Sequence, residues 1–179
     1  MNDDLDVPLD RDEESSFESR PQSPDAAAAI LFRTRLEDLG IRKPIVVPIQ
    51  ATAAEACALM REHRIGCVLV MDGARLAGIF TERDVLYKLT GGRDASTAPI
   101  RELMTPNPTT LKAGHLLAHA LNKMTLDGCR HIPVVDDHGH PRSVVSVRRI
   151  VDFLVEHFAK ELANLPPDPD QEMGTAEGG

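Results

Sequence analysis

The sequence feature that most constrains the fold is an internal repeat. Residues 36–72 align with residues 100–136 without a gap at an offset of 64, and seven of the 37 aligned positions are identical. One extra residue in the turn around Gly139 shifts the offset to 65, after which Thr81 aligns with Ser146. Because the same order of elements returns with similar lengths, the chain is predicted to contain two copies of one supersecondary unit.

Each copy is predicted to contain a strand, an amphipathic helix, two strands joined by a turn, and a second helix. In the first copy these elements fall at residues 44–47, 53–62, 67–71, 76–80 and 82–89. In the second copy they fall at residues 108–111, 116–125, 132–135, 143–145 and 147–160. Thr52 and Glu55 have the capping-box spacing at the start of the first of these helices. The pattern predicts an α+β fold of two tandem β-α-β-β-α units.

The segments around the repeats differ from them in composition. The two ends of the chain are rich in acidic residues and poor in large apolar ones, which is typical of disorder. Ser23 has the residue type of a helix N-cap, and Gly40 is the expected stop of that helix. The predicted segments are a disordered acidic tail at 1–22, an N-terminal helix at 23–40 that leads into the first repeat, the first repeat at 36–90, a linker at 91–99, the second repeat at 100–158 and a disordered acidic tail at 161–179.

The net charge of −8 is unevenly distributed along the chain. Residues 1–24 contain eight acids and two arginines, and residues 161–179 contain five acids and no base, so the part between them carries +3. A weakly basic core is compatible with a bound anion. Nucleic acid is not expected as a partner, because aromatic residues make up only 3% of the chain.

Several classes of protein are excluded by what the sequence lacks. The first residues do not have the pattern of a signal peptide, and the longest apolar run, residues 26–32, is far shorter than a membrane span. The three cysteines form no C-x-x-C pair, which favours reduced thiols and a cytoplasmic protein without a zinc site. The pair His115 and His119 is interpreted as a surface pair, because no third metal ligand is predictable nearby.

The stretch GIFTERDV at residues 78–85 joins a predicted strand to a predicted helix. Thr81 and Asp84 have the spacing of a capping box, in which each side chain bonds the backbone amide of the other residue. Exposed helix N-termini also attract anions, so a ligand-binding role is the second interpretation. Both interpretations stay open from the residues alone.

With the phrases GIFTERDVL and CRHIPVVDDHG in this repeated context, the chain resembles a tandem pair of cystathionine-beta-synthase (CBS) domains. This arrangement is called a Bateman module, and the resemblance is to the bacterial stand-alone type over about residues 36–158. It implies two small three-stranded sheets flanked by helices and related by a pseudo-twofold axis. It also implies clefts that hold adenosine-containing ligands, and pairing of two modules into a homodimer.

The resemblance implies a set of nucleotide-binding residues. Thr81 is expected to donate to phosphate or ribose, and Asp84 to accept from the ribose hydroxyls. The backbone of the first strand is expected near the adenine, and the second copy is expected to place a basic pair against the phosphate. The implied residues are Thr81, Asp84, Ile45, Val46, Val47, Arg130 and His131.

The equivalent residues form a possible second site of altered chemistry, namely Ser146, Arg149, Gly66 and Cys67. Arg149 stands where the first copy has an aspartate, and a guanidinium has only donors, so it cannot accept from a ribose diol. It is expected to hold a phosphate or nothing. The sequence therefore predicts one competent nucleoside site per chain and one that is empty or altered.

The function predicted from these residues is a regulatory module that senses an adenine nucleotide of the AMP, ADP or ATP class between its two copies. Signalling would pass through domain orientation or dimer contacts. Catalysis is not expected, because the sequence has neither a G-x-S-x-G nucleophile motif nor a P-loop, and no cofactor or metal is required. The alternative is a ligand-free structural or adaptor protein that dimerises and contacts an unidentified protein.

Overall fold

The structure is a computed structural model that describes residues 24–40, 42–89, 92 and 94–158. The tails predicted at 1–22 and 161–179 lie outside the described residues, as does part of the linker predicted at 91–99.

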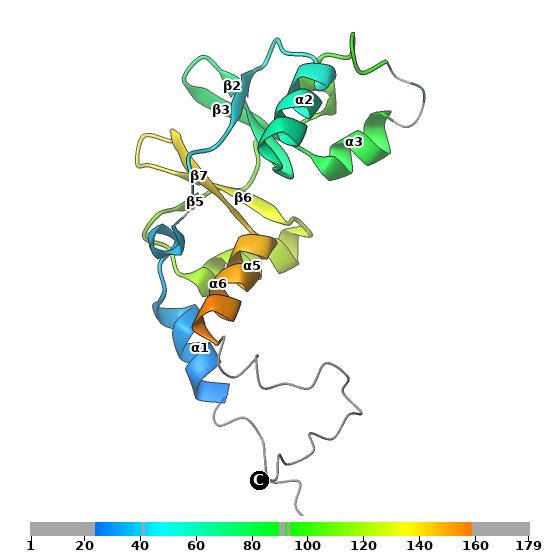
Figure 1. The fold of residues 1–179 in the computed structure, drawn as a ribbon. Helices are drawn as coiled ribbons and strands as arrows, with labels where there is room; N and C mark the ends of the chain where they lie inside the picture. The colour runs from blue at the N-terminus through cyan, green and yellow to red at the C-terminus, as the bar shows by residue number, and fades with distance from the viewer. Residues whose placement is uncertain (1–23, 41, 90–91, 93, 159–179) are drawn as a thin grey trace, which may run out of the picture.

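The two copies follow one another along the chain and lie end to end (Figure 1). The first copy contains β1 (Val46–Pro48), α2 (Ala53–His63), β2 (Cys67–Asp72), β3 (Arg75–Thr81) and α3 (Glu82–Leu89). The second copy contains β5 (Leu111–Lys112), α5 (Leu117–Asp127), β6 (His131–Val135), β7 (Pro141–Ser146) and α6 (Val147–His157). The segments that precede them are α1 (Pro24–Arg33) with the 3-10 helix η1 (Leu36–Leu39), and α4 (Ile100–Leu103) with β4 (Thr105–Pro106). The predicted β-α-β-β-α order is confirmed in both copies, with most element ends within two residues of the prediction.

Each copy builds one small mixed sheet. The order is β1-β2-β3-β4 in the first sheet and β5-β6-β7 in the second. The first strand pairs parallel with the second, and the second pairs antiparallel with the third, in both sheets. The first sheet also contains a fourth strand, β4, at its edge. This strand pairs antiparallel with β3 through Gly78 and Ile79. A strand of two residues is too short to show a periodicity, so the sequence did not predict it.

The two sheets share a detail of register. The pairing of β2 with β3 shifts between Val70 and Met71, and the pairing of β6 with β7 shifts between Val134 and Val135. These positions are equivalent at the repeat offset of 64. The repeat therefore preserves this register shift as well as the order of elements.

The capping box predicted at the start of α2 is confirmed. The Glu55 carboxylate accepts a hydrogen bond from the Thr52 backbone N–H at 2.7 Å, and the Thr52 hydroxyl accepts from the Glu55 backbone N–H at 3.3 Å. Both contacts are local in sequence, which explains why the residue spacing was sufficient to predict them.

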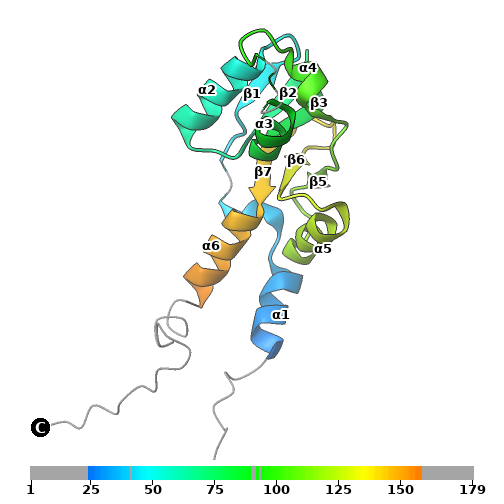
Figure 2. The same cartoon turned by 90° about the vertical axis from the view of Figure 1, so that its right-hand side faces the viewer.

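The cores do not follow the boundaries of the repeats. Leu36 and Leu39 of η1 are fully buried in the core of the second copy, although they precede the first. Ile100 and Leu103 of α4 are buried in the core of the first copy. Figure 2 shows α1 beside the second copy and α4 beside the first. The helical segment that precedes each copy is thus packed on the other copy.

Equivalent backbone hydrogen bonds hold the two exchanged segments. In the second copy, Leu36 N–H donates to the His115 carbonyl at 2.9 Å and Leu117 N–H donates to the Thr34 carbonyl at 2.9 Å. In the first copy, Ile100 N–H donates to the Ala51 carbonyl and Ala53 N–H donates to the Ala98 carbonyl, both also at 2.9 Å. The donors and acceptors match at the offset of 64, so the exchange is symmetric.

The segment predicted as one helix over 23–40 differs from the structure. The described helix α1 ends at Arg33, and η1 follows as a separate turn that ends at Gly40 with φ 60°. Arg35 between them is extended and forms a β-bridge with Leu116. This bridge to the second copy interrupts the helix, which a local helix pattern could not reveal.

A third apolar cluster joins the two sheets. Cys67, Leu69 and Ile79 are buried, and Leu76 and Val144 pack against them. Val144 belongs to β7, so this cluster connects the first sheet with the second. The face between the sheets is therefore where the two copies meet.

Candidate functional site

A groove of about 1030 Å³ runs between the two copies on one side of this contact. The first copy contributes the residues just before β1, the residues around the start of β2, and the junction of β3 with α3. The second copy contributes the residues before β5, the residues around the start of β6, and the junction of β7 with α6. Predicted site residues that line the groove are Ile45, Gly66, Cys67, Thr81, Asp84, Arg130, His131 and Ser146. One groove thus holds residues that the sequence assigned to two separate sites.

Thr81 and Asp84 form a capping box at the start of α3. The Asp84 Oδ2 accepts from the Thr81 N–H at 2.9 Å and from the Thr81 hydroxyl at 2.7 Å, and the Asp84 N–H donates to the Thr81 hydroxyl at 3.3 Å. Asp84 is nearly buried, with 7% of its surface exposed. Both residues also line the groove, so the structure shows the cap and leaves the ligand role as a prediction.

Lys88 fixes the second oxygen of the same carboxylate. Its Nζ lies 2.6 Å from the Asp84 Oδ1 and donates to the Leu103 carbonyl at 2.6 Å. The sequence interpretation missed this residue, although an acid and a lysine four residues apart on a helix are a recognised pairing signal. The carboxylate is therefore oriented by Thr81 on one side and Lys88 on the other.

The predicted basic pair, Arg130 and His131, also lines the groove. His131 is partly buried and stands directly against Gly66, where an added Cβ would be 3.0 Å from the His131 Cε1 and Nε2. The Arg130 side chain is exposed. Gly66 and His131 were assigned to different sites by the sequence, but in the structure they lie against each other and both line the groove.

Burial controls the titration of two groups here. Burial lowers the pKa of His131, the Glu82 carboxylate opposes that shift, and Arg130 adds to it. Burial, together with the nearby Glu82 carboxylate, raises the pKa of the Cys67 thiol to about 12. The groove therefore presents a neutral imidazole and an unreactive thiol near neutral pH.

The three predicted residues of the first strand differ in position. Ile45 lines the groove, and its carbonyl accepts from the Leu69 N–H at 3.0 Å. Val47 is buried in the core of the first copy, and Val46 is exposed outside the groove lining. Alternation along a strand places neighbouring side chains on opposite faces, so only part of such a run can face one ligand.

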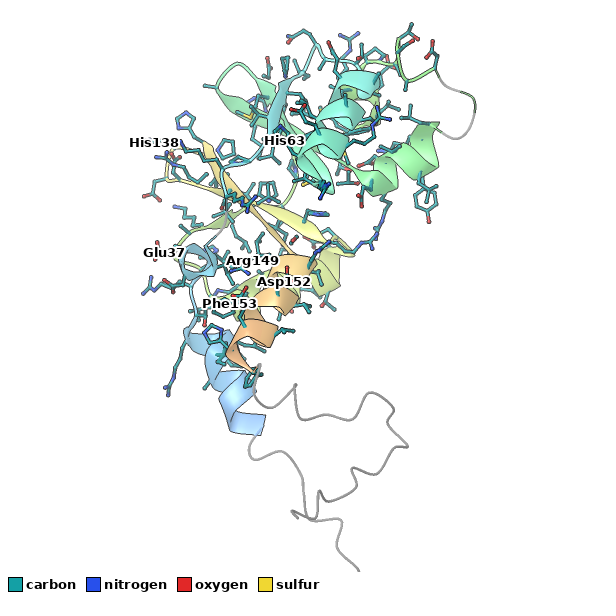
Figure 3. All side chains as sticks on the ribbon, in the orientation of Figure 1. Glu37, His63, His138, Arg149, Asp152 and Phe153 are labelled. Atoms are coloured by element: carbon teal, nitrogen blue, oxygen red, sulfur yellow. The ribbon has the colours of Figure 1, made fainter. Side chains whose placement is uncertain are left out.

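Arg149 does not line the groove. Its Nε donates to the Leu39 carbonyl at 2.7 Å, and its Nη1 pairs with Glu156 at 3.0 Å, so the side chain joins α6 to η1 (Figure 3). Ser146 does line the groove, and its hydroxyl accepts from the Arg149 N–H at 3.2 Å. Arg149 therefore contacts the exchanged segment and its own helix, and the empty or altered second site stays a prediction.

Most of the charge in the groove was not singled out from the sequence. Six basic side chains line it against three carboxylates, namely Arg42, Lys43, Arg64, Arg83, Arg130 and Arg148 against Glu82, Asp84 and Asp127. The Arg83 Nη1 donates to the Gly128 carbonyl at 2.9 Å, and Arg148 lies 3.9 Å from Asp152. The side chains of the other four arginines and lysines make no hydrogen bond or ion pair within the described residues. The groove is thus suited to an anion.

A smaller hollow of about 420 Å³ lies between the turns of the two hairpins. His138 and His140 line it, and His140 lies 3.5 Å from Asp136. No group of three or more His, Cys, Asp or Glu residues in the described ranges is arranged to hold a metal ion. No helix in that same part of the chain is both long and apolar enough to cross a membrane.

The family model described as CBS domain matches residues 36–91 and 100–156. The chain therefore belongs to the CBS domain family and carries a tandem pair of these domains. The matched ranges correspond to the two sequence repeats and include η1 and α4 of the exchanged segments.

Curated relatives differ in how much of their length matches. An uncharacterized 17.7 kDa protein of Acidianus ambivalens is 32% identical over 124 residues, which are 69% of this chain and 74% of that protein. The CBS domain-containing protein YhcV of Bacillus subtilis is 29% identical over 113 residues, 63% of this chain and 77% of that protein. The CBS domain-containing protein CBSCBSPB5 of Arabidopsis thaliana is 34% identical over 101 residues, 55% of this chain, but the match spans only 18% of that protein.

Two solved structures share the fold. A CBS domain protein from Pyrobaculum aerophilum, complexed with AMP, has a TM-score of 0.64 at 24% identity and covers 74% of this chain and 100% of its own. The CBS domain pair of protein MJ0100, in complex with 5′-methylthioadenosine and S-adenosyl-L-methionine, has a TM-score of 0.63 at 25% identity. It covers 68% of this chain and 99% of its own.

Proposed function

We propose that this protein is a non-catalytic regulatory module that binds an adenine nucleotide of the AMP, ADP or ATP class in the groove between its two CBS domains. The observation that carries the proposal is the composition of that groove. An oriented hydroxyl and carboxylate, Thr81 and Asp84, share it with four basic side chains that have no partner in the described residues. The two adenosine compounds bound by the MJ0100 domain pair support a ligand that contains adenosine.

Each end of the ligand has a chemically matched part of the groove. The Asp84 carboxylate has about four acceptor positions and uses three of them in the cap and the Lys88 contact, so one position remains to accept from a ribose hydroxyl. The cations suit the phosphate. A neutral nucleoside would leave those charges unused, which favours a nucleotide.

Binding can be communicated through contacts that cross between the copies. Arg83 of α3 lines the groove and donates to the Gly128 carbonyl of the second copy at 2.9 Å. A phosphate that takes this guanidinium would compete with that bond and change how the copies are held. Only a ligand with different affinities for two arrangements can shift their populations.

The test is thermal unfolding with adenosine, AMP, ADP, ATP and S-adenosylmethionine, comparing the wild type with Asp84→Asn. A ligand at 100 times its dissociation constant adds about 2.7 kcal/mol to the free energy of unfolding, which raises the midpoint by several degrees. Asp84→Asn keeps the shape of the cap but weakens acceptance from the ribose, so it should reduce the rise.

The matched control is Glu55→Gln, because Glu55 occupies the same position in the capping box of α2 and lies outside the groove. It should change the stability without changing the response to the nucleotide. If both variants respond as the wild type does, Asp84 has no ligand role.

A second candidate function is the ligand-free adaptor, which is favoured by exposed apolar side chains on α3 and α6. Tyr87 of α3 is 74% exposed, and Val151 and Val155 of α6 are 50% and 45% exposed. Such side chains are suited to a contact with a second copy or another protein. If no compound in the panel raises the unfolding midpoint, this function takes the place of the first.

A further inference from the structure

Arg64 occupies a backbone conformation that disfavours a side chain. It ends α2 with φ 52° and ψ 48°, in the left-handed region. Residues with a Cβ adopt this region at a cost, whereas glycine adopts it freely. At the equivalent position of the second copy, Gly128 ends α5 with φ 62° and ψ 24°. The second copy therefore has the residue that the turn favours, and the first copy has an arginine.

The Arg64 side chain makes no polar contact that would hold the fold together within the described residues. It is exposed and makes no hydrogen bond or ion pair within the described residues. The backbone N–H of Arg64 donates to the carbonyls of Arg61 and Met60, which a glycine would do equally well. A residue that keeps an unfavourable backbone conformation, while its side chain makes no polar contact in the fold, indicates a role outside folding.

Arg64 lies where a ligand would meet it. It lines the groove two residues before Gly66, which stands against His131. The helix end fixes its Cα, so the guanidinium is presented from a rigid backbone. The C-terminus of a helix carries partial negative charge, which repels an anion, so a cation is needed for this wall of the groove to accept one.

We propose that Arg64 is a specificity-determining residue that makes the groove select a phosphorylated ligand over the neutral nucleoside. The inference rests on the proposed function, since it assumes that an adenosine compound enters the groove. A guanidinium matches the phosphate group with two parallel N–H donors. The backbone strain at the end of α2 is then the cost of that selectivity.

The test compares Arg64→Gly with the wild type by isothermal titration calorimetry, using adenosine and AMP as probes. Arg64→Gly removes the charge and relieves the backbone, so the thermal midpoint without ligand should be unchanged or higher. The affinity for AMP should fall at least tenfold, and the affinity for adenosine should stay within about twofold, since one charge-assisted contact is lost. A residue with only a structural role would not give higher stability together with weaker AMP binding.

Two further variants separate the charge from the backbone. Arg64→Lys keeps the charge in the same strained position and should bind AMP more tightly than Arg64→Gly. Arg101→Ala removes an exposed charge of α4 outside the groove and should leave both affinities unchanged.

The outcomes distinguish this inference from the proposed function. Equal losses of adenosine and AMP affinity in Arg64→Gly, or no loss of either, would overturn the role of Arg64 and leave the proposed function standing. A wild type that binds neither probe would overturn both.

Discussion

Replacing Leu39 with alanine should destabilise the second copy, although Leu39 precedes the first copy in the sequence. The side chain is fully buried among residues of the second core, and the equivalent Leu103 is 1% exposed in the first core. Truncating a buried leucine to alanine costs about 3 kcal/mol, through lost burial and the cavity that remains. That corresponds to an increase of about 100-fold in the population of locally opened molecules.

The measurement is amide hydrogen exchange read by mass spectrometry under native conditions, peptide by peptide. Leu39→Ala should accelerate exchange in α5 and β6 by about 100-fold and affect α2 and β2 much less. Leu103→Ala should do the reverse. Leu126→Ala is the surface control, since that side chain on α5 is 70% exposed and its loss should change neither region.

Two results would refute this reasoning. Faster exchange of α2 in Leu39→Ala would mean that the preceding segment packs on its own copy. Equal acceleration of both copies in both variants would mean that the two cores open as one unit, so that the exchanged segments do not define separate cores.

Two further predictions concern the strand that leads into the groove and a histidine within it. Gly78→Ala should lower the free energy of unfolding, measured in urea, by about 1 to 3 kcal/mol. The added Cβ would lie 2.9 Å from both the Met104 Cγ and the Thr105 carbonyl oxygen, and the backbone oxygen cannot easily move away. A loss under about 0.5 kcal/mol would contradict this contact. Because the pKa of His131 is lowered in the folded protein, the unfolded chain takes up the proton first as the pH falls. The free energy of unfolding should therefore decrease as the pH drops below the ordinary histidine value of 6.5. Between pH 7.5 and pH 5.5, His131→Gln should show a smaller decrease than the wild type. An equal fall in both proteins would show that other groups cause it.

The parts of the fold that the sequence predicted are those with local causes. The capping box of Thr52 and Glu55 and the alternation of strands and helices depend on residues close together in the chain. The exchange of the preceding segments could not be predicted in this way. Leu39 and Leu103 occupy the same repeat position, so the sequence pattern fits either core equally well.

The site was predictable to a similar extent. Thr81 and Asp84 belong to a short motif, and the structure brings them together in the groove. The cations Arg42, Lys43 and Arg64 were missed, because isolated basic residues in turns carry no periodic signal and resemble ordinary surface charge. Only the groove, which requires both copies, shows that they gather on one ligand-sized space.

The second copy shows which of these contacts the fold requires. Lys88 donates to the Leu103 carbonyl in the first copy, and Arg149 donates to the equivalent Leu39 carbonyl in the second. At the offset of 65, Arg149 stands in the position of Asp84, and the position of Lys88 is taken by the buried Phe153. The second copy thus keeps the hydrogen bond from the last helix to the exchanged segment but lacks the carboxylate.

That comparison favours a ligand role for the carboxylate that remains. Helix α6 begins with the Ser146 hydroxyl accepting from the Arg149 N–H and needs no acid to complete the cap. Neither the helix cap nor the hydrogen bond to the exchanged segment requires a carboxylate. These two contacts therefore do not explain why the first copy has an aspartate, Asp84, that is nearly buried and lines the groove. A ribose diol supplies the missing reason, because it is a ligand that needs an oriented acceptor and would gain nothing from the arginine of the second copy.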